Sequence, residues 1–213
     1  MGTLIALEGL DGAGKRTLVD KLVSELTSAG VRVAVRTFPR YGASIHADLA
    51  AEALKGAHGD MAGSVNAMAV LFALDRGGAV AELTELLERH DIVLLDRYVA
   101  SNAAYGAARL RQGPDGEFVE WVRELEFERL GLPRPALQML LDVPVELARA
   151  RALAREASDS TRELDAYERD SDLQTRTGAV YRGLAQQEWV SSWKRLDPDV
   201  DPAALAADLA QWI

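Results

Sequence analysis

Cysteine is absent from this chain of 213 residues, and its absence excludes several kinds of chemistry at once. Without thiols the protein can form no disulfide, no thiolate nucleophile and no Cys-ligated zinc or iron–sulfur centre. Histidine is scarce as well, because the chain has three, and their spacing is not that of a zinc site or a catalytic triad. A cysteine-free composition fits a reducing cytosol, so we expect a cytoplasmic protein.

Long apolar runs and an excess of positive charge are also missing. No stretch approaches the roughly 18 apolar residues that read as a membrane span, and the amino-terminal residues lack the basic and apolar regions of a signal peptide. We therefore expect no membrane association. With 24 basic and 33 acidic residues the net charge is −9, which disfavours a nucleic-acid partner because phosphate neutralisation needs a basic face. One positively charged cleft remains compatible with this balance.

The sequence that is present alternates short apolar runs with longer helical patterns. We predict strands at 3–8, 31–38, 91–96 and 137–143, with a fifth near 189–196. Helical patterns follow the first strand up to the stop signal Gly30 and recur at 64–89, 116–130 and 164–187. Near-continuous apolar strands indicate a parallel sheet covered on both faces. With no linker dividing the chain, we expect one doubly wound α/β domain over residues 1–213.

A glycine-rich loop, GLDGAGKRT at 9–17, follows the first strand and precedes an amphipathic helix. The pattern Gly-x4-Gly-Lys places main-chain N–H groups around phosphate oxygens, with Lys15 reaching the terminal phosphates. The following helix adds its free amino-terminal N–H groups. The sequence departs from the usual motif at Arg16, where a Ser or Thr normally offers its hydroxyl to Mg²⁺; here the hydroxyl comes one residue later, at Thr17. A guanidinium at this position adds a forked phosphate donor instead.

An apolar strand that ends in an acid supplies the second half of a nucleotide-binding signature. Residues 92–96 have the sequence IVLLD, four apolar residues followed by Asp96. In phosphate-loop proteins an acid at the end of such a strand lies near Mg²⁺. Taken alone, an aspartate that caps a helix or forms a salt bridge is the simpler interpretation. The glycine-rich loop upstream favours the interpretation in which Asp96 lies near Mg²⁺.

A segment rich in both charges spans residues 145–170. Its arginines alternate with acidic residues, and its middle, ASDSTRE, has few apolar anchors. One interpretation is a solvated pair of helices with many ion pairs. The other is a lid that brings arginines to a phosphate. The spacing does not choose between them.

Several motifs together resemble the bacterial thymidylate kinase (dTMP kinase) family. They are the loop GLDGAGKRT, FPRYG at 38–42, LFALDR at 71–76, DRYVASNAAY at 96–105 and RTGAVY at 176–181. The resemblance implies a three-layer α/β/α P-loop kinase fold with a five-stranded parallel sheet and a short arginine-containing lid at about 145–165. It also implies a homodimer that uses Mg²⁺ and ATP, the phosphoryl donor, to convert dTMP to dTDP by direct in-line transfer.

The resemblance assigns residues to the ATP side of the site. The implied phosphate cradle comprises Gly9, Gly12, Ala13, Gly14, Lys15, Arg16 and Thr17. The implied lid contacts to ATP are Arg151, Arg155 and Arg162. Asp11, inside the loop, corresponds to an acid near the acceptor sugar and the magnesium, and Glu168 is the second implied metal contact. The implied catalytic residues are Asp11, Lys15, Arg16, Arg97 and Arg155.

The resemblance also implies an acceptor site for dTMP. Arg97 binds its phosphate, while Phe38 and Tyr41 flank the sugar and phosphate. Phe72 stacks on the thymine, and the polar edge of the base is bound by Arg76, Ser101 and Asn102. Tyr105 crowds the 2′ position and so disfavours ribonucleotides, and Tyr167 completes the site beside Glu168. Independently of the family, Phe72 and Arg76 are four residues apart and share one helical face, which suits a flat base with a polar edge.

Two alternative functions stay open on the residues alone. One is another small P-loop kinase that acts on a different nucleoside or nucleoside monophosphate. The other, from a different class, is a nucleotide-dependent switch without an acceptor; a guanine switch would need an NKxD motif, which the sequence lacks. Residues 64–80, rich in Ala, Val, Met and Leu, are the candidate dimer seam, with packing inside one subunit as the equal alternative.

Overall fold

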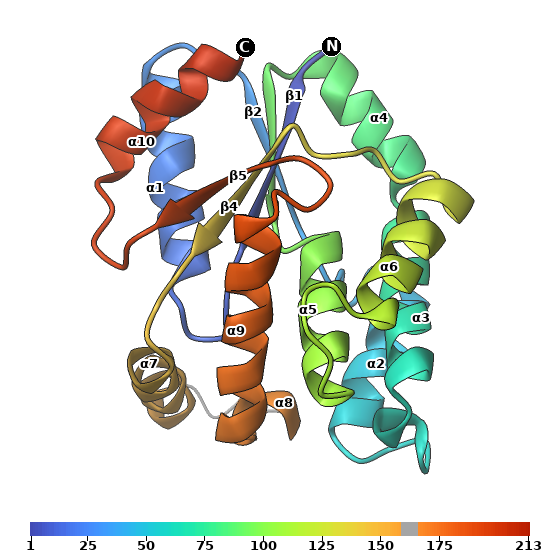
Figure 1. The fold of residues 1–213 in the computed structure, drawn as a ribbon. Helices are drawn as coiled ribbons and strands as arrows, with labels where there is room; N and C mark the ends of the chain where they lie inside the picture. Colours follow the sequence, from blue (N-terminus) through green and yellow to red (C-terminus); the bar gives the residue numbers. More distant parts are fainter. Residues whose placement is uncertain (159–165) are drawn as a thin grey trace.

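Five parallel strands form a single sheet in the order β2-β3-β1-β4-β5 (Figure 1). The strands are β1 (Thr3–Glu8), β2 (Val33–Thr37), β3 (Ile92–Asp96), β4 (Leu137–Leu141) and β5 (Ser192–Leu196). The computed structural model describes residues 1–158 and 166–213, and for residues 155–158 and 168 it describes the backbone alone. The predicted five-stranded parallel sheet is confirmed.

The central strands are buried along their whole length, as their apolar sequences require. Every residue of β3 and β4 is buried, and only the first residue of β1 is partly exposed. Ile5 pairs with Leu94 on one side and with Leu137 on the other, so three apolar runs lie in register at the centre. Strands covered by helices on both faces have no polar face to alternate with.

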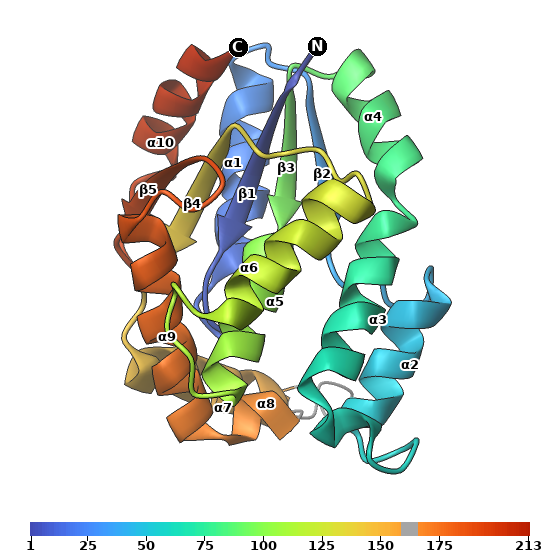
Figure 2. The same cartoon turned by 45° about the vertical axis from the view of Figure 1, so that its right-hand side comes forward.

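Helices cover both faces of the sheet (Figures 1 and 2). One face carries α1 (Lys15–Ser28) and α10 (Pro202–Leu209), and the other carries α5 (Val99–Arg109) and α9 (Ser171–Gln186). The remaining elements are α2 (Ile45–Leu54), η1 (Met61–Gly63), α3 (Val65–Gly77), α4 (Val80–Arg89), α6 (Glu117–Arg123), η2 (Glu124–Arg129), α7 (Val145–Ser158), α8 (Ala166–Arg169) and η3 (Ala210–Trp212). The three-layer α/β/α arrangement is therefore confirmed.

The helices differ in detail from the sequence prediction. The long pattern at 64–89 is two helices, α3 and α4, because the consecutive glycines 77 and 78 favour a helix end. Residues 164–187 are likewise divided, and the side chain of Asp170 caps α9 by accepting from the Leu173 N–H. Helices α2, α5 and α10 were not predicted. In α5 every residue from Val99 to Ala108 is buried, so its sequence lacks the polar face that reveals an amphipathic helix.

The carboxyl ends of the strands meet at one edge of the sheet, where chain segments distant in sequence come together. The glycine-rich loop follows β1, the FPRYG segment follows β2, and Arg97 follows β3. In open α/β sheets this edge is the usual place for ligands. Within the part of the chain that the structure describes, no helix is long and apolar enough to cross a membrane.

Candidate active site

The glycine-rich loop between β1 and α1 is shaped by its main chain. Gly9, Gly12 and Gly14 all have positive φ angles, of 145°, 76° and 102°, which residues with a Cβ rarely adopt. A Cβ at Gly12 would also lie 2.1 Å from the carbonyl oxygen of Ala148 in α7. Because α1 begins directly after Gly14, its free N–H groups face the loop and favour an anion there.

Lys15 is buried at the base of this loop. Its ammonium group donates to the carbonyl oxygens of Gly9, at 2.9 Å, and Leu10, at 2.8 Å. Burial and the nearby charge of Arg97 lower the pKa of Lys15 to about 8. Arg16 is different: its side chain is 76% exposed and pairs with Asp20, one turn along α1, at 3.4 Å. Of these two cations, Lys15 lies inside the loop and Arg16 on its outer side.

Helix α7 packs against the glycine-rich loop through Ala148 and Arg151. Arg151 donates from Nη1 to the carbonyl oxygen of Ala13 at 2.9 Å, and Ala148 packs on Gly12. The structure thus brings Arg151 of the predicted lid to the predicted cradle. The other predicted lid residues, the side chain of Arg155 and the whole of Arg162, lie outside the described residues, as does the side chain of Glu168.

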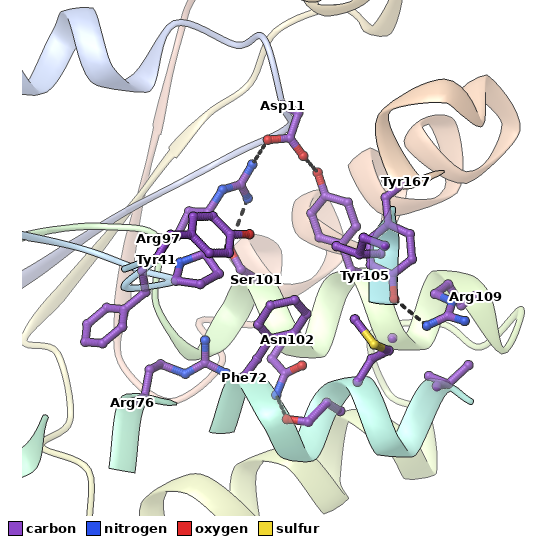
Figure 3. Close-up of a pocket in the computed structure, with 17 residues that line it drawn as sticks. Asp11, Tyr41, Phe72, Arg76, Arg97, Ser101, Asn102, Tyr105, Arg109 and Tyr167 are labelled. Carbon is purple, nitrogen blue, oxygen red and sulfur yellow. Dashed lines mark hydrogen bonds and ion pairs between the residues drawn. The ribbon is translucent and has the colours of Figure 1, made fainter. Parts of the chain in front are cut away.

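A largely apolar pocket opens beside the loop, between α3, α5 and the segment after β2 (Figure 3). It encloses about 690 Å³ when the open solvent at its mouth is included. The predicted acceptor residues that line it are Asp11, Phe38, Tyr41, Phe72, Arg76, Arg97, Ser101, Asn102, Tyr105 and Tyr167. Residues from five separate parts of the chain therefore converge on one cavity.

At the end of the pocket nearest the loop, Asp11 joins Arg97 to Tyr105. Arg97 Nη2 lies 2.5 Å from Asp11 Oδ1, and the Tyr105 hydroxyl donates to Asp11 Oδ2 at 2.6 Å (Figure 3). Burial by itself would raise the pKa of Asp11, but the charges of Arg97 and Lys15 and these hydrogen bonds outweigh it and hold the pKa at about 2. Asp11 therefore carries a negative charge at neutral pH, with one oxygen bonded to Arg97 and the other to Tyr105.

A fully buried carboxylate, that of Glu8 at the end of β1, lies behind Arg97 and is linked to it through Ser101. It accepts from the Tyr98 N–H at 2.9 Å and from the Ser101 hydroxyl at 2.6 Å. Ser101 in turn accepts from Arg97 Nη1 at 3.1 Å. Burial raises the pKa of Glu8 against the opposing effects of these bonds and of the Arg97 charge. The hydroxyl of Ser101 thus faces the Arg97 end of the pocket.

The opposite end of the pocket combines an aromatic ring with a polar pair. Phe72 and Arg76 come from α3 and Asn102 from α5 (Figure 3). Arg76 is held by Glu126 of η2, with Nε to Oε2 at 2.5 Å and Nη2 to Oε1 at 2.7 Å. The Asn102 amide nitrogen donates to the same carboxylate at 2.8 Å. A buried bidentate pair of this kind fixes the direction of the guanidinium plane.

Aromatic rings of very different exposure surround the mouth of the pocket. Tyr41 is 54% exposed, whereas Phe38 is buried and packs on Tyr98. Across the mouth, the rings of Tyr105 and Tyr167 stack with centroids 6.0 Å apart. Arg109 donates to the Tyr167 hydroxyl and to the carbonyl oxygen of Ala62 in η1, both at 2.5 Å. These bonds tie α8 to the segment before α3.

The described residues offer few ligands for a magnesium ion. Among the described residues, no group of three or more His, Cys, Asp or Glu side chains could hold a metal. Asp96, at the end of β3, has a buried Oδ1 without a hydrogen-bond partner in the part of the chain that the structure describes. An unpartnered carboxylate oxygen is suited to Mg²⁺, which is usually bound by one or two carboxylates with phosphates and water completing its shell.

Three polar residues of the site were missed by the sequence analysis: Glu8, Arg109 and Glu126. A signal for Glu126 was present, because it lies four residues after Val122 on a stripe that includes buried Phe118, and a charged residue on an apolar stripe is rarely buried without a partner. Glu8 ends an otherwise apolar strand in the same way. Arg109 had no such signal, since an arginine at a helix end is ordinarily a surface residue.

Comparison with known proteins gives one consistent result. The thymidylate kinase family model matches residues 7–197. A thymidylate kinase of Mycobacterium tuberculosis is 58% identical over 207 residues, covering 97% of each chain. The thymidylate kinase of Thermomicrobium roseum is 36% identical, over 97% of this chain and 91% of its own. That of Rhodopseudomonas palustris is 34% identical, over 88% of this chain and 78% of its own.

Proposed function

The chain belongs to the thymidylate kinase family, and from that premise we propose that it transfers the γ-phosphoryl group of ATP to dTMP bound in the pocket between α3 and α5. The observation that carries the proposal is the position of Arg97 at the boundary between pocket and glycine-rich loop, 2.5 Å from Asp11. A nucleoside monophosphate with its phosphate on Arg97 presents an oxygen toward the terminal phosphate of a nucleotide in the loop. Attack by that oxygen releases ADP and leaves dTDP.

The acceptor lies along the pocket with its two ends in different surroundings. Its phosphate meets Arg97, and its base lies against Phe72 with the polar edge toward Arg76 and Asn102. The sugar then passes Tyr105, whose ring is fixed by its bond to Asp11 and by stacking on Tyr167. Because the Tyr105 ring is held on both sides, it cannot move aside for an extra 2′-hydroxyl. The site should therefore prefer deoxyribonucleotides to ribonucleotides.

The donor side supplies cations and main-chain N–H groups. Phosphoryl transfer develops charge on equatorial oxygens and needs positioned positive groups more than a strong base. Lys15 binds loop carbonyls in the free protein, and the phosphates of ATP replace those carbonyls as its partners. Arg151 stands over the loop and is the described lid arginine best placed to reach ATP. Asp11, with its pKa at about 2, acts as a positioner.

Mg²⁺ is part of the proposal, with Asp96 as the first candidate ligand through its unpartnered Oδ1. When bound with the phosphates, the ion neutralises their charge. Both carboxylate oxygens of Asp11 already accept hydrogen bonds, from Arg97 and Tyr105, so we place Asp11 near the ion and not among its direct ligands. The predicted contact from Glu168 remains a prediction.

A homodimer and a cytoplasmic location complete the proposal. Helix α3 exposes Val70 and Leu74, and the neighbouring α2 exposes Ile45, outside the pocket lining. A second copy would cover these apolar side chains. Light scattering of the purified protein tests this directly: a mass of two chains is expected, and Leu74→Glu should halve it.

A coupled assay of ADP release tests the activity. We expect turnover with ATP and dTMP to exceed turnover with dCMP, because the base end has a fixed donor and acceptor, and to exceed turnover with thymidine, because the phosphate end needs a phosphate. Equal rates with dTMP and dCMP would contradict the base assignment. ADP release that does not depend on any acceptor would favour the nucleotide switch instead.

A further inference from the structure

Glu126 is completely buried, yet it lines neither the pocket nor the glycine-rich loop. Its carboxylate accepts from Arg76 Nε and Nη2, at 2.5 and 2.7 Å, and from Asn102 Nδ2 at 2.8 Å. Both partners come from other helices and both line the pocket. One buried carboxylate thus holds the two polar groups at the base end.

The bonds of Asn102 determine which way its amide faces. Its nitrogen donates to Glu126 and also to the main-chain oxygen of Ala69, at 3.0 Å. A paired carboxylate and a carbonyl oxygen can only accept, so the reverse orientation of the amide would set oxygen against oxygen twice. With its nitrogen bonded to these two acceptors, the amide oxygen is left for the pocket, which Asn102 lines.

The base end of the pocket consequently offers a fixed order of hydrogen-bonding groups. Asn102 Oδ1 is an acceptor, and the N–H groups of Arg76 that Glu126 does not use are donors. A pyrimidine with a 4-oxo group and an N3–H matches this order, because its oxygen accepts from Arg76 and its N–H donates to Asn102. A pyrimidine with a 4-amino group and a bare N3 sets donor against donor and acceptor against acceptor.

We propose that Glu126 is the positioning residue that makes the pocket select 4-oxo over 4-amino pyrimidine nucleotides. The proposal rests on the proposed function and names what determines its base preference. Glu126 touches no substrate and acts through Arg76 and Asn102. A site built to pair particular polar groups discriminates strongly, since the wrong base leaves buried groups unpaired.

The local backbone explains how an acidic residue comes to lie there. Residues Glu124–Arg129 form a π-helical turn, closed by a bond from the Leu130 N–H to the Leu125 carbonyl at 3.0 Å. The turn brings two consecutive side chains, Glu126 and Phe127, into the interior, while its exposed Glu128 pairs with surface arginines. Turns of this type are rare and occur often at functional sites.

The first test is Glu126→Gln, with dTMP and dCMP as competing acceptors at saturating ATP. A glutamine can accept at one oxygen only, so it cannot hold Arg76 at two points and Asn102 together. We expect the ratio of kcat/KM for dTMP to that for dCMP to fall at least about tenfold. The change should arise mainly in the KM for the acceptor, with the KM for ATP within about twofold of the starting protein.

A second variant and a control separate positioning from general damage. Glu126→Asp keeps the charge beside Arg76, so it should fold, but its shorter side chain cannot reach all three donors, and the ratio should fall by a smaller factor. Glu128→Gln, an exposed change two residues away, should leave the ratio unchanged. Thermal unfolding of each variant identifies those that are folded at the assay temperature.

The outcomes are distinct. An unchanged dTMP to dCMP ratio in a folded Glu126→Gln protein, even with both rates reduced, would overturn the inference; if that variant does not fold, an unchanged ratio in Glu126→Asp decides in the same way. Failure of the proposed function would instead appear in the unmutated protein, as a lack of turnover with dTMP.

Discussion

The two halves of the site are made in opposite ways. The phosphate cradle is main chain: three glycines with positive φ angles, and two loop carbonyls that bind Lys15. The acceptor pocket is lined by side chains from the loop after β1, the segments after β2 and β3, α3, α5 and α8. Ion pairs hold two of its arginines, the partly buried pair of Arg97 with Asp11 and the buried pair of Arg76 with Glu126. The cradle depends on backbone shape, whereas the pocket depends on which side chains meet.

The difference shows where each half tolerates change. In the cradle an added atom obstructs, because a Cβ at Gly12 would meet the carbonyl of Ala148. In the pocket a missing atom harms, because a buried charge loses its partner, which is far more costly than the pair is stabilising. Substitutions on each side should therefore affect different kinetic constants.

The largest effect is expected for Lys15→Ala, on the donor side. Loss of the single buried ammonium in the cradle removes charge stabilisation from the transition state, and kcat should fall by about 10²–10³-fold. Unfolding temperature should change little, because burial disfavours the charged lysine in the folded protein. Lys21→Ala, an exposed change on the same helix, is the control, and equal activity of the two variants would remove Lys15 from the mechanism.

Arg97→Ala should produce the next largest effect, and on the acceptor side. The KM for dTMP should rise by about 10²-fold, because the acceptor phosphate loses its charge-assisted hydrogen bonds, while the KM for ATP changes by much less. Initial-rate kinetics with each substrate varied in turn measure both. Arg89→Ala, which removes an exposed arginine paired with Glu85, controls for charge. An equal rise in the KM for dTMP and the KM for ATP would contradict the assignment of Arg97 to the acceptor side.

Gly12→Ala should affect the donor side alone, and by less. The added Cβ must displace α7 from the loop, so the KM for ATP should rise by roughly tenfold while the KM for dTMP changes little. Gly30→Ala is a matched control, since Gly30 also has a positive φ, of 84°, but has nothing within 4 Å of an added Cβ. If both variants bind ATP equally, contact with α7 is irrelevant to the cradle.

The smallest effect is expected for Tyr105→Ala, measured as the preference for dTMP over the ribonucleotide with the same base. Removal of the ring should relax this preference several-fold, because the space beside the sugar opens. Tyr105→Phe keeps the ring and loses the hydrogen bond to Asp11, so it should retain more of the preference than Tyr105→Ala. An unaltered preference in both would show that the ring does not crowd the 2′ position.

The sequence predicted the cradle better than the pocket, and for a physical reason. Backbone conformations that exclude a Cβ leave glycines in the sequence, and the loop at 9–17 was located from them. The sheet was predicted because its buried strands are continuous apolar runs. The fully buried helix α5 has neither signal, so it was missed, although it carries Ser101, Asn102 and Tyr105.

The pocket's supporting residues could not be located from spacing. Glu126 meets Arg76 across 50 residues of sequence, and Glu8 meets Ser101 across 93. Such pairs arise from the packing of separate elements, and a motif records only neighbours in the chain. The family resemblance supplied the residues that line the pocket, while those behind them required the three-dimensional structure.

Arg97 has a positive φ, of 68°, a conformation that glycine or asparagine adopts with less strain. Its N–H bonds to the Leu7 carbonyl at 2.9 Å, and Glu8 anchors the next residue, so the fold holds the backbone there firmly. If folding stability were the only selective pressure, a lineage carrying this protein would tend to drift to glycine at position 97. We propose that an arginine stands there in spite of the strain because its guanidinium has a chemical role that glycine could not fill.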